Sequence, residues 1–225
     1  MNILGLDTAT TTTSVAVMRA DGAVYEAEDV APAGSRGRHA EHVLSLAAEV
    51  LERAGLRWRD VDLIAVGLGP GGYTGLRIGL ASARGLALAH GAPLAGVGTL
   101  RALAEPLHAT TVLAIVDARR GELFTAAYRD YVEVLAPSVT QPGELPALLG
   151  AAAASGGATA LGDGAQIHRD LLEGAGFKVP GERSALHRVS AGSICRIAAA
   201  GAGSSAAAPI YLRRPDAERS LAAGR

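Results

Sequence analysis

The 225-residue chain has little cysteine, few aromatic residues and almost no net charge. The single cysteine, Cys195, excludes a disulfide within the chain and is typical of a reducing compartment. A formal net charge of −1 gives no overall positive field, so we expect only weak binding of tRNA or DNA by the chain alone. The longest apolar stretches are interrupted by Arg77, Arg84 or His90, which predicts no membrane span. Because Met1 leads directly into a predicted strand without a signal peptide, we expect a cytoplasmic protein.

Complete catalytic signatures are also missing from the sequence. It contains no G-x-S-x-G elbow, no HExxH pair and no Walker A lysine. His39 and His42 lie three positions apart near the start of a predicted helix, but no third ligand accompanies them, which favours solvated or interface histidines over a metal site. Cys195 lies in an apolar helical pattern, where a buried, unreactive thiol is expected. The sequence therefore predicts no catalytic residue and no metal ligand.

The most distinctive segment covers residues 66–91, where an apolar strand is followed by a glycine-rich turn and a long helix of small residues. Pro70 stiffens the turn, and Thr74 is placed to cap the helix. The helix N-terminus could bind an anion, and a tight connection without a ligand is an equally good interpretation. A dinucleotide site is disfavoured, because no acidic residue follows about 20 positions later to hold a ribose. The glycines concerned are Gly67, Gly69, Gly71, Gly72, Gly75 and Gly79.

Asp7 ends the first predicted strand and precedes a threonine-rich turn. Its carboxylate could hold a hydrated magnesium ion while nearby hydroxyls and amides approach a phosphate. A plain hairpin turn is the favoured alternative, because Ala9 stands where a phosphate-binding turn usually needs glycine. Strong phosphoryl transfer is therefore not expected.

The chain also contains an internal repeat. Residues 112–129 repeat the strand, aspartate, turn and strand pattern of residues 2–19, with Asp117 in the place of Asp7. Such a repeat predicts a duplicated fold with two lobes, which we place at residues 1–105 and 106–225, the second being smaller. Apolar runs at 63–68 and 94–97 flank the long helix and predict a parallel strand–helix–strand unit.

Five segments, in order along nearly the whole chain, resemble the TsaB (YeaZ) family: LGLDTATTTTSVAV, RHAEHVLSLAAEVLERAG, GLGPGGYTGLRIGLASARGLALAHGAPLAGVGTL, DARRGELFTAAY and PIYLRR. The resemblance implies an α/β, duplicated two-lobe fold of the actin, sugar kinase and Hsp70 type (ASKHA, ribonuclease H-like). It also implies a non-catalytic subunit that dimerises with TsaD, the ATP-using enzyme that places threonylcarbamoyl on N6 of the adenosine beside the tRNA anticodon. The small ATPase TsaE is an implied further partner.

The resemblance also suggests a nucleotide site. ATP or ADP with magnesium would bind weakly, and no cofactor would be required by this subunit. The matching positions are Asp7, Thr8, Gly71, Gly72 and Arg77. An autonomous ATPase or kinase is the alternative function, and a metalloprotease, which would need metal at His39 and His42, is a third.

Two predicted helices supply a candidate partner surface. The apolar arc of helix 38–54 is too wide for one core, and the small residues of helix 74–89 would let another helix approach closely. We therefore expect a helical-bundle interface with a TsaD-like subunit, and a homodimer through the same surface when that partner is absent. The predicted interface residues are His42, Leu44, Ala48, Gly75, Gly79 and Ala83.

The tRNA itself is expected to be contacted through the complex. Four helix-borne arginines are too few to hold tRNA strongly, but they could extend a basic surface that the partner supplies. These are Arg36, Arg38, Arg213 and Arg214.

Overall fold

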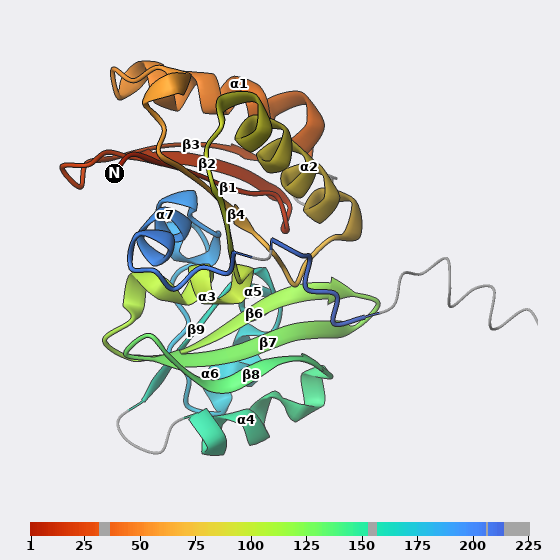
Figure 1. Cartoon of the computed structure of the whole chain (residues 1–225). Coiled ribbons are helices and arrows are strands. Elements are labelled where there is room, and N and C mark those ends of the chain that lie inside the picture. Colours follow the sequence, from red (N-terminus) through yellow and green to blue (C-terminus); the bar gives the residue numbers. More distant parts are fainter. Residues whose placement is uncertain (32–36, 153–156, 206, 214–225) are drawn as a thin grey trace, which may run out of the picture.

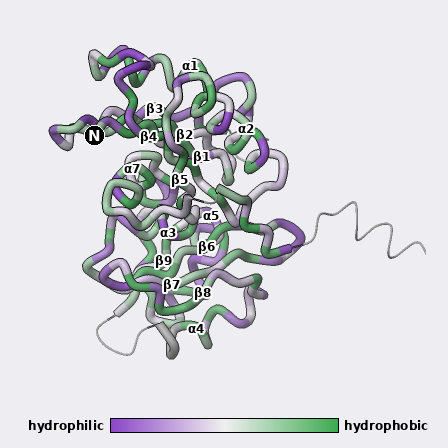
Figure 2. The backbone as a smooth tube through the Cα atoms, in the orientation of Figure 1, coloured by the Kyte–Doolittle hydropathy of each residue, from purple (hydrophilic) through white to green (hydrophobic). Residues whose placement is uncertain are grey.

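The computed structural model describes residues 1–31, 37–152, 157–205 and 207–213 (Figure 1). They form two mixed β-sheets, one above the other, with helices outside each sheet and between them (Figure 1). We call the sheet at the N-terminus, with its outer helices, the first lobe and the other sheet, with its outer helices, the second lobe. Figure 2 shows hydrophobic residues concentrated in the strands of both sheets.

The first sheet has the strand order β3-β2-β1-β4-β5. β1 pairs with β2 and β2 with β3 in antiparallel hairpins, whereas β4 lies parallel to both β1 and β5. The predicted hairpin and the predicted parallel crossover are therefore confirmed. The strands are β1 (Ile3–Asp7), β2 (Thr12–Met18), β3 (Val24–Val30), β4 (Leu63–Gly67) and β5 (Leu94–Val97).

The second sheet repeats this order without the fifth strand, as β8-β7-β6-β9. The repeat extends to a hydrogen bond at the end of the strand that opens each first hairpin. Asp7 Oδ1 accepts the amide of Ala9 at 2.8 Å, and Asp117 Oδ1 accepts the amide of Arg119 at 2.8 Å. The predicted duplicated α/β architecture is thus confirmed. The strands are β6 (Thr111–Arg119), β7 (Glu122–Arg129), β8 (Val132–Thr140) and β9 (Ala158–Leu161).

The helices form three layers around the two sheets. α1 (His39–Arg53) and α2 (Tyr73–His90) cover the outer face of the first sheet, and α3 (Thr99–Ala104) and α7 (Ala191–Ala199) lie between the sheets (Figure 1). Among the described residues, none of the helices combines the length and the apolar character that a membrane span requires. The second lobe adds α4 (Leu145–Ala152), α5 (Asp163–Ile167) and α6 (Arg169–Gly174), and single 3-10 turns occur at Trp58–Asp60, Glu105–Leu107, Pro142–Glu144 and Ala185–His187.

The two central helices each pack beyond their own half of the sequence. α7, near the end of the chain, packs on β1 and β2, and α3 packs on β6 and β7. Cys195 of α7 is fully buried against β1, where its thiol donates to the carbonyl of Ile3 at 3.4 Å, and burial raises the pKa of this thiol to about 12. This agrees with the expectation of an unreactive thiol. The division of the chain at residue 105 stays a prediction, because these helices join the two lobes into one core.

The small residues of α2 correct one sequence-based interpretation. Gly75, Gly79 and Ala83 are buried within the chain, so they are not accessible to a partner helix. A side chain at Gly75 would meet the carbonyl of Thr8, and one at Gly79 would meet the Thr8 hydroxyl. The small residues instead let α2 lie directly on the turn of the first hairpin.

The start of α2 also differs from the prediction. The helix begins at Tyr73, and Gly72 is its N-cap residue without a side-chain cap hydrogen bond. Thr74 therefore lies inside the first turn instead of capping it. Gly72 takes this position because its amide bonds to the carbonyl of Ala9 at 2.7 Å.

Replacing Gly75 by alanine should destabilise the protein by about 1–3 kcal/mol, the usual cost of overpacking, because the new methyl group meets backbone. Gly85→Ala on the same helix is the matched control: a methyl group at that position points into open space, so helix propensity should raise stability by up to about 1 kcal/mol. Urea denaturation gives both free energies of unfolding. Equal effects of the two substitutions would contradict the inward packing of Gly75.

Candidate functional site

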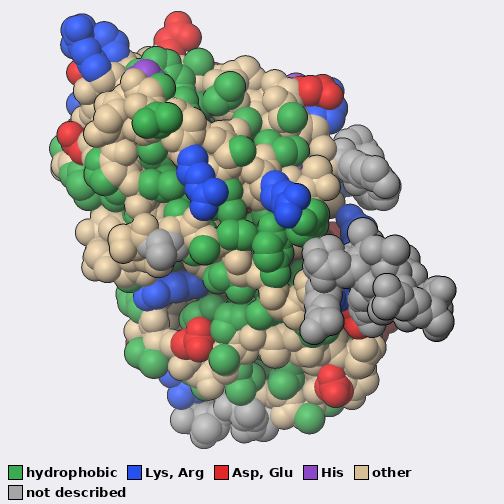
Figure 3. All heavy atoms as spheres, turned by 45° about the vertical axis from the view of Figure 1, so that its right-hand side comes forward, with side chains coloured by type: hydrophobic (Ala, Val, Ile, Leu, Met, Phe, Trp, Pro, Cys, Tyr) green, Lys and Arg blue, Asp and Glu red, His purple; other side chains and the backbone are tan. Residues whose placement is uncertain are grey.

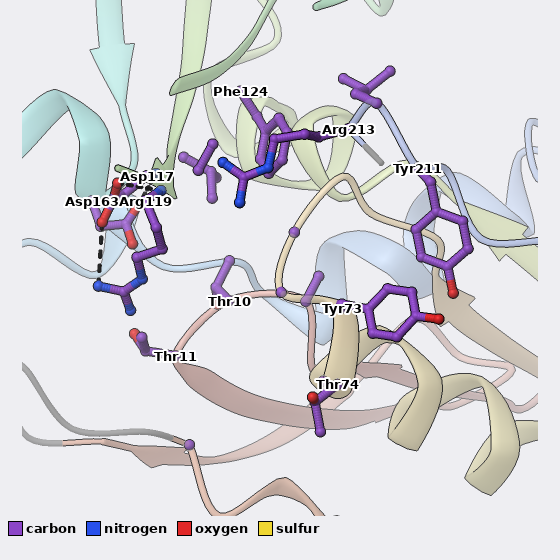
Figure 4. A pocket seen from close by; sticks show the side chains of 18 of the residues that line it. Thr10, Thr11, Tyr73, Thr74, Asp117, Arg119, Phe124, Asp163, Tyr211 and Arg213 are labelled. Carbon is purple, nitrogen blue, oxygen red and sulfur yellow. Dashed lines mark hydrogen bonds and ion pairs between the residues drawn. The ribbon is translucent and has the colours of Figure 1, made fainter. Parts of the chain in front are cut away.

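A cavity of about 450 Å³ lies between the two lobes (Figure 4). Its walls come from the turns of both first hairpins, the glycine loop with the start of α2, and residues 210–213 of the C-terminal segment. A second hollow of about 370 Å³ adjoins it on the side of residues 182–189. The polar residues that line both hollows are Thr10, Thr11, Asp117, Arg119 and Asp163.

Asp7 is not among the described residues that line the cavity. Its side chain is fully buried, with Oδ1 bound to the Ala9 amide and Oδ2 accepting the hydroxyl of Thr99 at 2.8 Å. The same Thr99 oxygen accepts the amide of Gly69 at 3.0 Å. A side chain at Gly67 would collide with this carboxylate. Asp7 therefore connects the first hairpin to α3 and the glycine loop, and it does not present a carboxylate to a magnesium ion in the cavity.

The predicted phosphate-binding groups around Asp7 are also engaged within the chain. The Thr8 hydroxyl is buried and donates to the carbonyl of Gly75 at 2.7 Å. The amide of Gly72 donates to Ala9. Gly71 and Gly72 do line the cavity, but the Gly72 amide at the helix N-terminus already has a partner.

Arg77 lies outside the cavity lining on the exposed face of α2. Its guanidinium lies 4.0 Å from the centre of the Tyr73 ring, and its Nε donates to the Tyr211 hydroxyl at 3.4 Å. Of the five predicted nucleotide-binding residues, the structure thus brings only Gly71 and Gly72 to the cavity. A nucleotide site on this subunit stays a prediction, and Asp7 does not fit the magnesium part of it.

The acidic side chains that do face the cavity come from the second lobe (Figure 4). Asp163 Oδ1 accepts the amides of Asp117 at 2.9 Å and Gly164 at 2.8 Å, and Arg119 pairs with Asp117 at 3.3 Å. Burial, and to a lesser extent the charge of Asp117, raise the pKa of Asp163. These residues were not predicted to belong to the site, although the repeat at Asp117 and the Gly162-Asp163-Gly164 turn were available signals.

The two candidate metal-ligating histidines point to different surroundings. His39 is buried, its Nδ1 lies 2.9 Å from the Thr13 hydroxyl, and burial lowers its pKa. His42 Nε2 lies 3.9 Å from a carboxylate oxygen of Glu41. Within the described part of the chain, no group of three or more His, Cys, Asp or Glu side chains could hold a metal ion.

The outer face of α1 and α2 carries exposed apolar residues. Leu44 is 52% exposed, Ala48 is exposed on the same helix, and Leu88 of α2 is 87% exposed. Figure 3 shows hydrophobic side chains spread over the upper lobe on the side where α2 comes forward. Of the predicted interface residues, Leu44 and Ala48 are therefore accessible, and His42 is partly so.

Two of the four arginines that were predicted to extend a basic surface can be placed, and that surface stays a prediction. Arg213 lies in a bend instead of a helix and pairs with Glu122 at 2.8 Å. Arg38 precedes α1 and pairs with Asp29 at 3.1 Å. Arg36 and Arg214 lie outside the described residues. The two arginines that can be placed are thus already paired with carboxylates.

Comparison with known proteins gives consistent similarities. Residues 23–167 match the family model described as TsaD, tRNA N6-adenosine threonylcarbamoyltransferase. The tRNA threonylcarbamoyladenosine biosynthesis protein TsaB of Escherichia coli is 39% identical over 133 residues, which cover 57% of this chain and 55% of that protein. An uncharacterized protein of Mycobacterium tuberculosis is 35% identical over 154 residues, which cover 66% of this chain and 72% of that one. The alignment with the Escherichia coli protein thus spans about half of that relative's length.

A solved structure extends the similarity to nearly the whole chain. The structure of YeaZ from Pseudomonas aeruginosa superposes with a TM-score of 0.75 at 26% sequence identity. The superposition covers 94% of this chain and 99% of that one. It therefore includes residues of both lobes.

The buried Asp7 predicts a pH-dependent stability. Burial raises the pKa of Asp7 from 3.8 to about 6, so the folded protein binds this proton more tightly than the unfolded chain does. The resulting stabilisation is complete below about pH 4 and is lost as the pH rises through about 6. Asp7→Asn stays neutral at both pH values. Relative to the parent, its free energy of unfolding should therefore rise by about 2 kcal/mol when the pH is changed from about 4.5 to about 7.5.

Urea unfolding of the parent and the Asp7→Asn protein at both pH values measures this difference, and any pH-independent effect of the substitution cancels. Asp21→Asn, at an exposed position, serves as the control. A parent and variant whose stabilities change in parallel with pH would show that the Asp7 carboxyl is not desolvated.

Proposed function

This chain belongs to the TsaB (YeaZ) family, and we propose that it is a non-catalytic subunit in the biosynthesis of threonylcarbamoyladenosine in tRNA. In this proposal it binds and activates a TsaD-like catalytic subunit, which modifies N6 of the adenosine beside the anticodon. A TsaE-like ATPase works with the pair, and tRNA is held by the complex as a whole. The function rests on family membership together with the geometry of the cleft.

The single observation that carries the non-catalytic part of the proposal is the position of Asp7. An ATPase or kinase built on this fold would need a carboxylate from the first hairpin directed at the bound metal and phosphates. Here both carboxylate oxygens are hydrogen-bonded to the Ala9 amide and the Thr99 hydroxyl beneath the cavity wall. The geometry thus gives no support to the alternative of an autonomous ATPase or kinase. Weak binding of ATP or ADP in the cleft, without turnover, remains part of the proposal.

The outer face of α1 and α2 is the proposed partner surface. Exposed leucines such as Leu44 and Leu88 are costly to leave in water, and a patch of this kind is typical of a protein–protein interface. Both helices pack on the first sheet, which holds them in position for a bundle with two helices of the partner. The same face can pair with a second copy of this chain in a homodimer.

A reconstituted transfer assay tests the proposed role. With labelled threonine, bicarbonate, ATP and tRNA, the isolated chain should transfer no threonylcarbamoyl group, and adding it to a TsaD-like subunit with its accessory proteins should raise the rate at least about tenfold. The control is the same mixture without this chain. Robust transfer by the isolated chain, or no stimulation of the complete mixture, would contradict the proposal.

Substitutions on the outer face test the partner surface. Leu44→Glu and Ala48→Glu place a charge at exposed apolar positions, so each should weaken association with the catalytic subunit by about 2 kcal/mol or more while leaving the thermal midpoint unchanged. Calorimetric titration measures the affinity. Ile167→Glu, at a 61% exposed apolar position on the second lobe, is the matched control. If the three variants bind equally well, the interface lies elsewhere.

A further inference from the structure

The C-terminal segment 207–213 contains most of the PIYLRR motif, to which the proposed function gives no role. This segment runs from the first lobe to the second (Figure 1), and its residues 210–213 line the cavity between them. We call residues 207–213 the strap. Because the strap contacts both lobes, it can affect how the two lobes are held together.

The strap is attached to the first lobe by several contacts. Arg84 of α2 donates to the carbonyl of Ala207 at 2.7 Å. The amide of Ile210 donates to the carbonyl of Leu68, just after β4, at 2.7 Å, and the Ile210 side chain packs into the core beneath α2. The Tyr211 ring lies 5.3 Å from the ring of Tyr73 at the start of α2.

The next two residues reach the second lobe. Leu212 packs against the core cluster that lies between the sheets. Arg213 forms an ion pair with Glu122 of β7 at 2.8 Å, and the two side chains are only 18% and 20% exposed. A pair of this kind is less screened by solvent than a fully exposed one.

The strap also forms part of the cavity wall. Residues 210–213 all line the 450 Å³ cavity, and Figure 4 shows Tyr211 beside Tyr73 and Arg213 beside Phe124. Ile210 packs against the core of the first lobe and Leu212 against the core between the sheets, while the Tyr211 ring contacts Tyr73 of α2. Displacement of the strap would therefore widen the cavity and remove a link between the lobes at the same time.

We propose that the strap couples the exposed face of α2 to the closure of the cleft between the lobes. Arg77 and Arg84 project from that face, and both donate hydrogen bonds to the strap. A molecule that engages these arginines releases the strap from α2, and the strap then no longer holds β7 close to the glycine loop. By the reciprocity of linked equilibria, opening the cleft from the second lobe frees the same arginines. This coupling goes beyond the proposed function and requires no partner subunit, since it is a property of the chain alone.

Hydrogen exchange of two amides reports on the two walls of the cleft. The Gly72 amide bonds to Ala9 in the first lobe, and the Asp117 amide bonds to Asp163 in the second. Arg84→Ala removes an attachment of the strap to the first lobe, and Glu122→Gln removes the charge that holds it to the second. Mass-spectrometric exchange of peptides containing these amides should be measured in the full chain.

The expected result is an effect across the cleft. Arg84→Ala should speed exchange of the Asp117 amide, and Glu122→Gln should speed exchange of the Gly72 amide, each by about two- to tenfold, the range expected for one lost hydrogen bond. Arg53→Ala is the matched control, because Arg53 also donates to a backbone carbonyl, that of Glu26, but within the first lobe. It should change neither amide.

The decisive observation is the effect of each substitution on amide exchange in the opposite lobe. If each variant speeds exchange only within the strap and in the lobe that it alters, the strap merely rests on the surface and the proposal is wrong. Unchanged exchange at both amides in both variants overturns it equally. Because the two substitutions lie on different lobes and at accessible or half-buried positions, a folding defect in one leaves the other as an independent test.

Discussion

The close packing of α2 on the turn of the first hairpin is the constraint on which the rest of this structure depends. Buried polar groups must be hydrogen-bonded, and here they are paired across three segments: Thr8 with Gly75, Gly72 with Ala9, and Asp7 with Thr99. The pairings of Thr8 with Gly75 and of Gly72 with Ala9 require that α2 lie within contact of the turn, which only glycine at its inner positions permits. These internal contacts therefore determine the position of the glycine loop. They also determine the position of the outer face of α2, which follows the loop.

Local patterns were sufficient to predict much of the fold. The strand–turn–strand pattern with its threonine-rich turn predicted the first hairpin, continuous apolar runs predicted the parallel unit around β4 and β5, and the repeated aspartate predicted the duplication. The site was harder to predict, since a stripe of small residues has the same appearance whether it meets a partner or its own chain. Gly75 and Gly79 were misassigned for that reason. The packing of α7 on β1 and the pairing of Arg213 with Glu122 are long-range contacts that no local pattern specifies.

The two halves of the duplicated fold have diverged at equivalent aspartates. Asp7 and Asp117 each accept the amide two residues later, so this hydrogen bond is shared between the two lobes. In the first lobe Thr99 closes over the carboxylate, whereas in the second lobe the carboxylate stays at the cavity wall beside Arg119. Desolvation without a cationic partner explains why the pKa of Asp7 is raised. Of these two aspartates, Asp7 thus has a structural role, and Asp117 is the one whose carboxylate faces the cleft.

Helix α2 connects these features because each of its sides makes a different set of contacts. Its inner side holds the hairpin turn, its N-terminus borders the cavity, and its exposed side carries Leu88 together with the arginines that contact the strap. A helix packed this tightly cannot adjust one side independently, because close-packed interiors transmit displacement instead of absorbing it. In the coupling proposed above, a contact made on the outer side of α2 acts on the cleft through the strap and the glycine loop together.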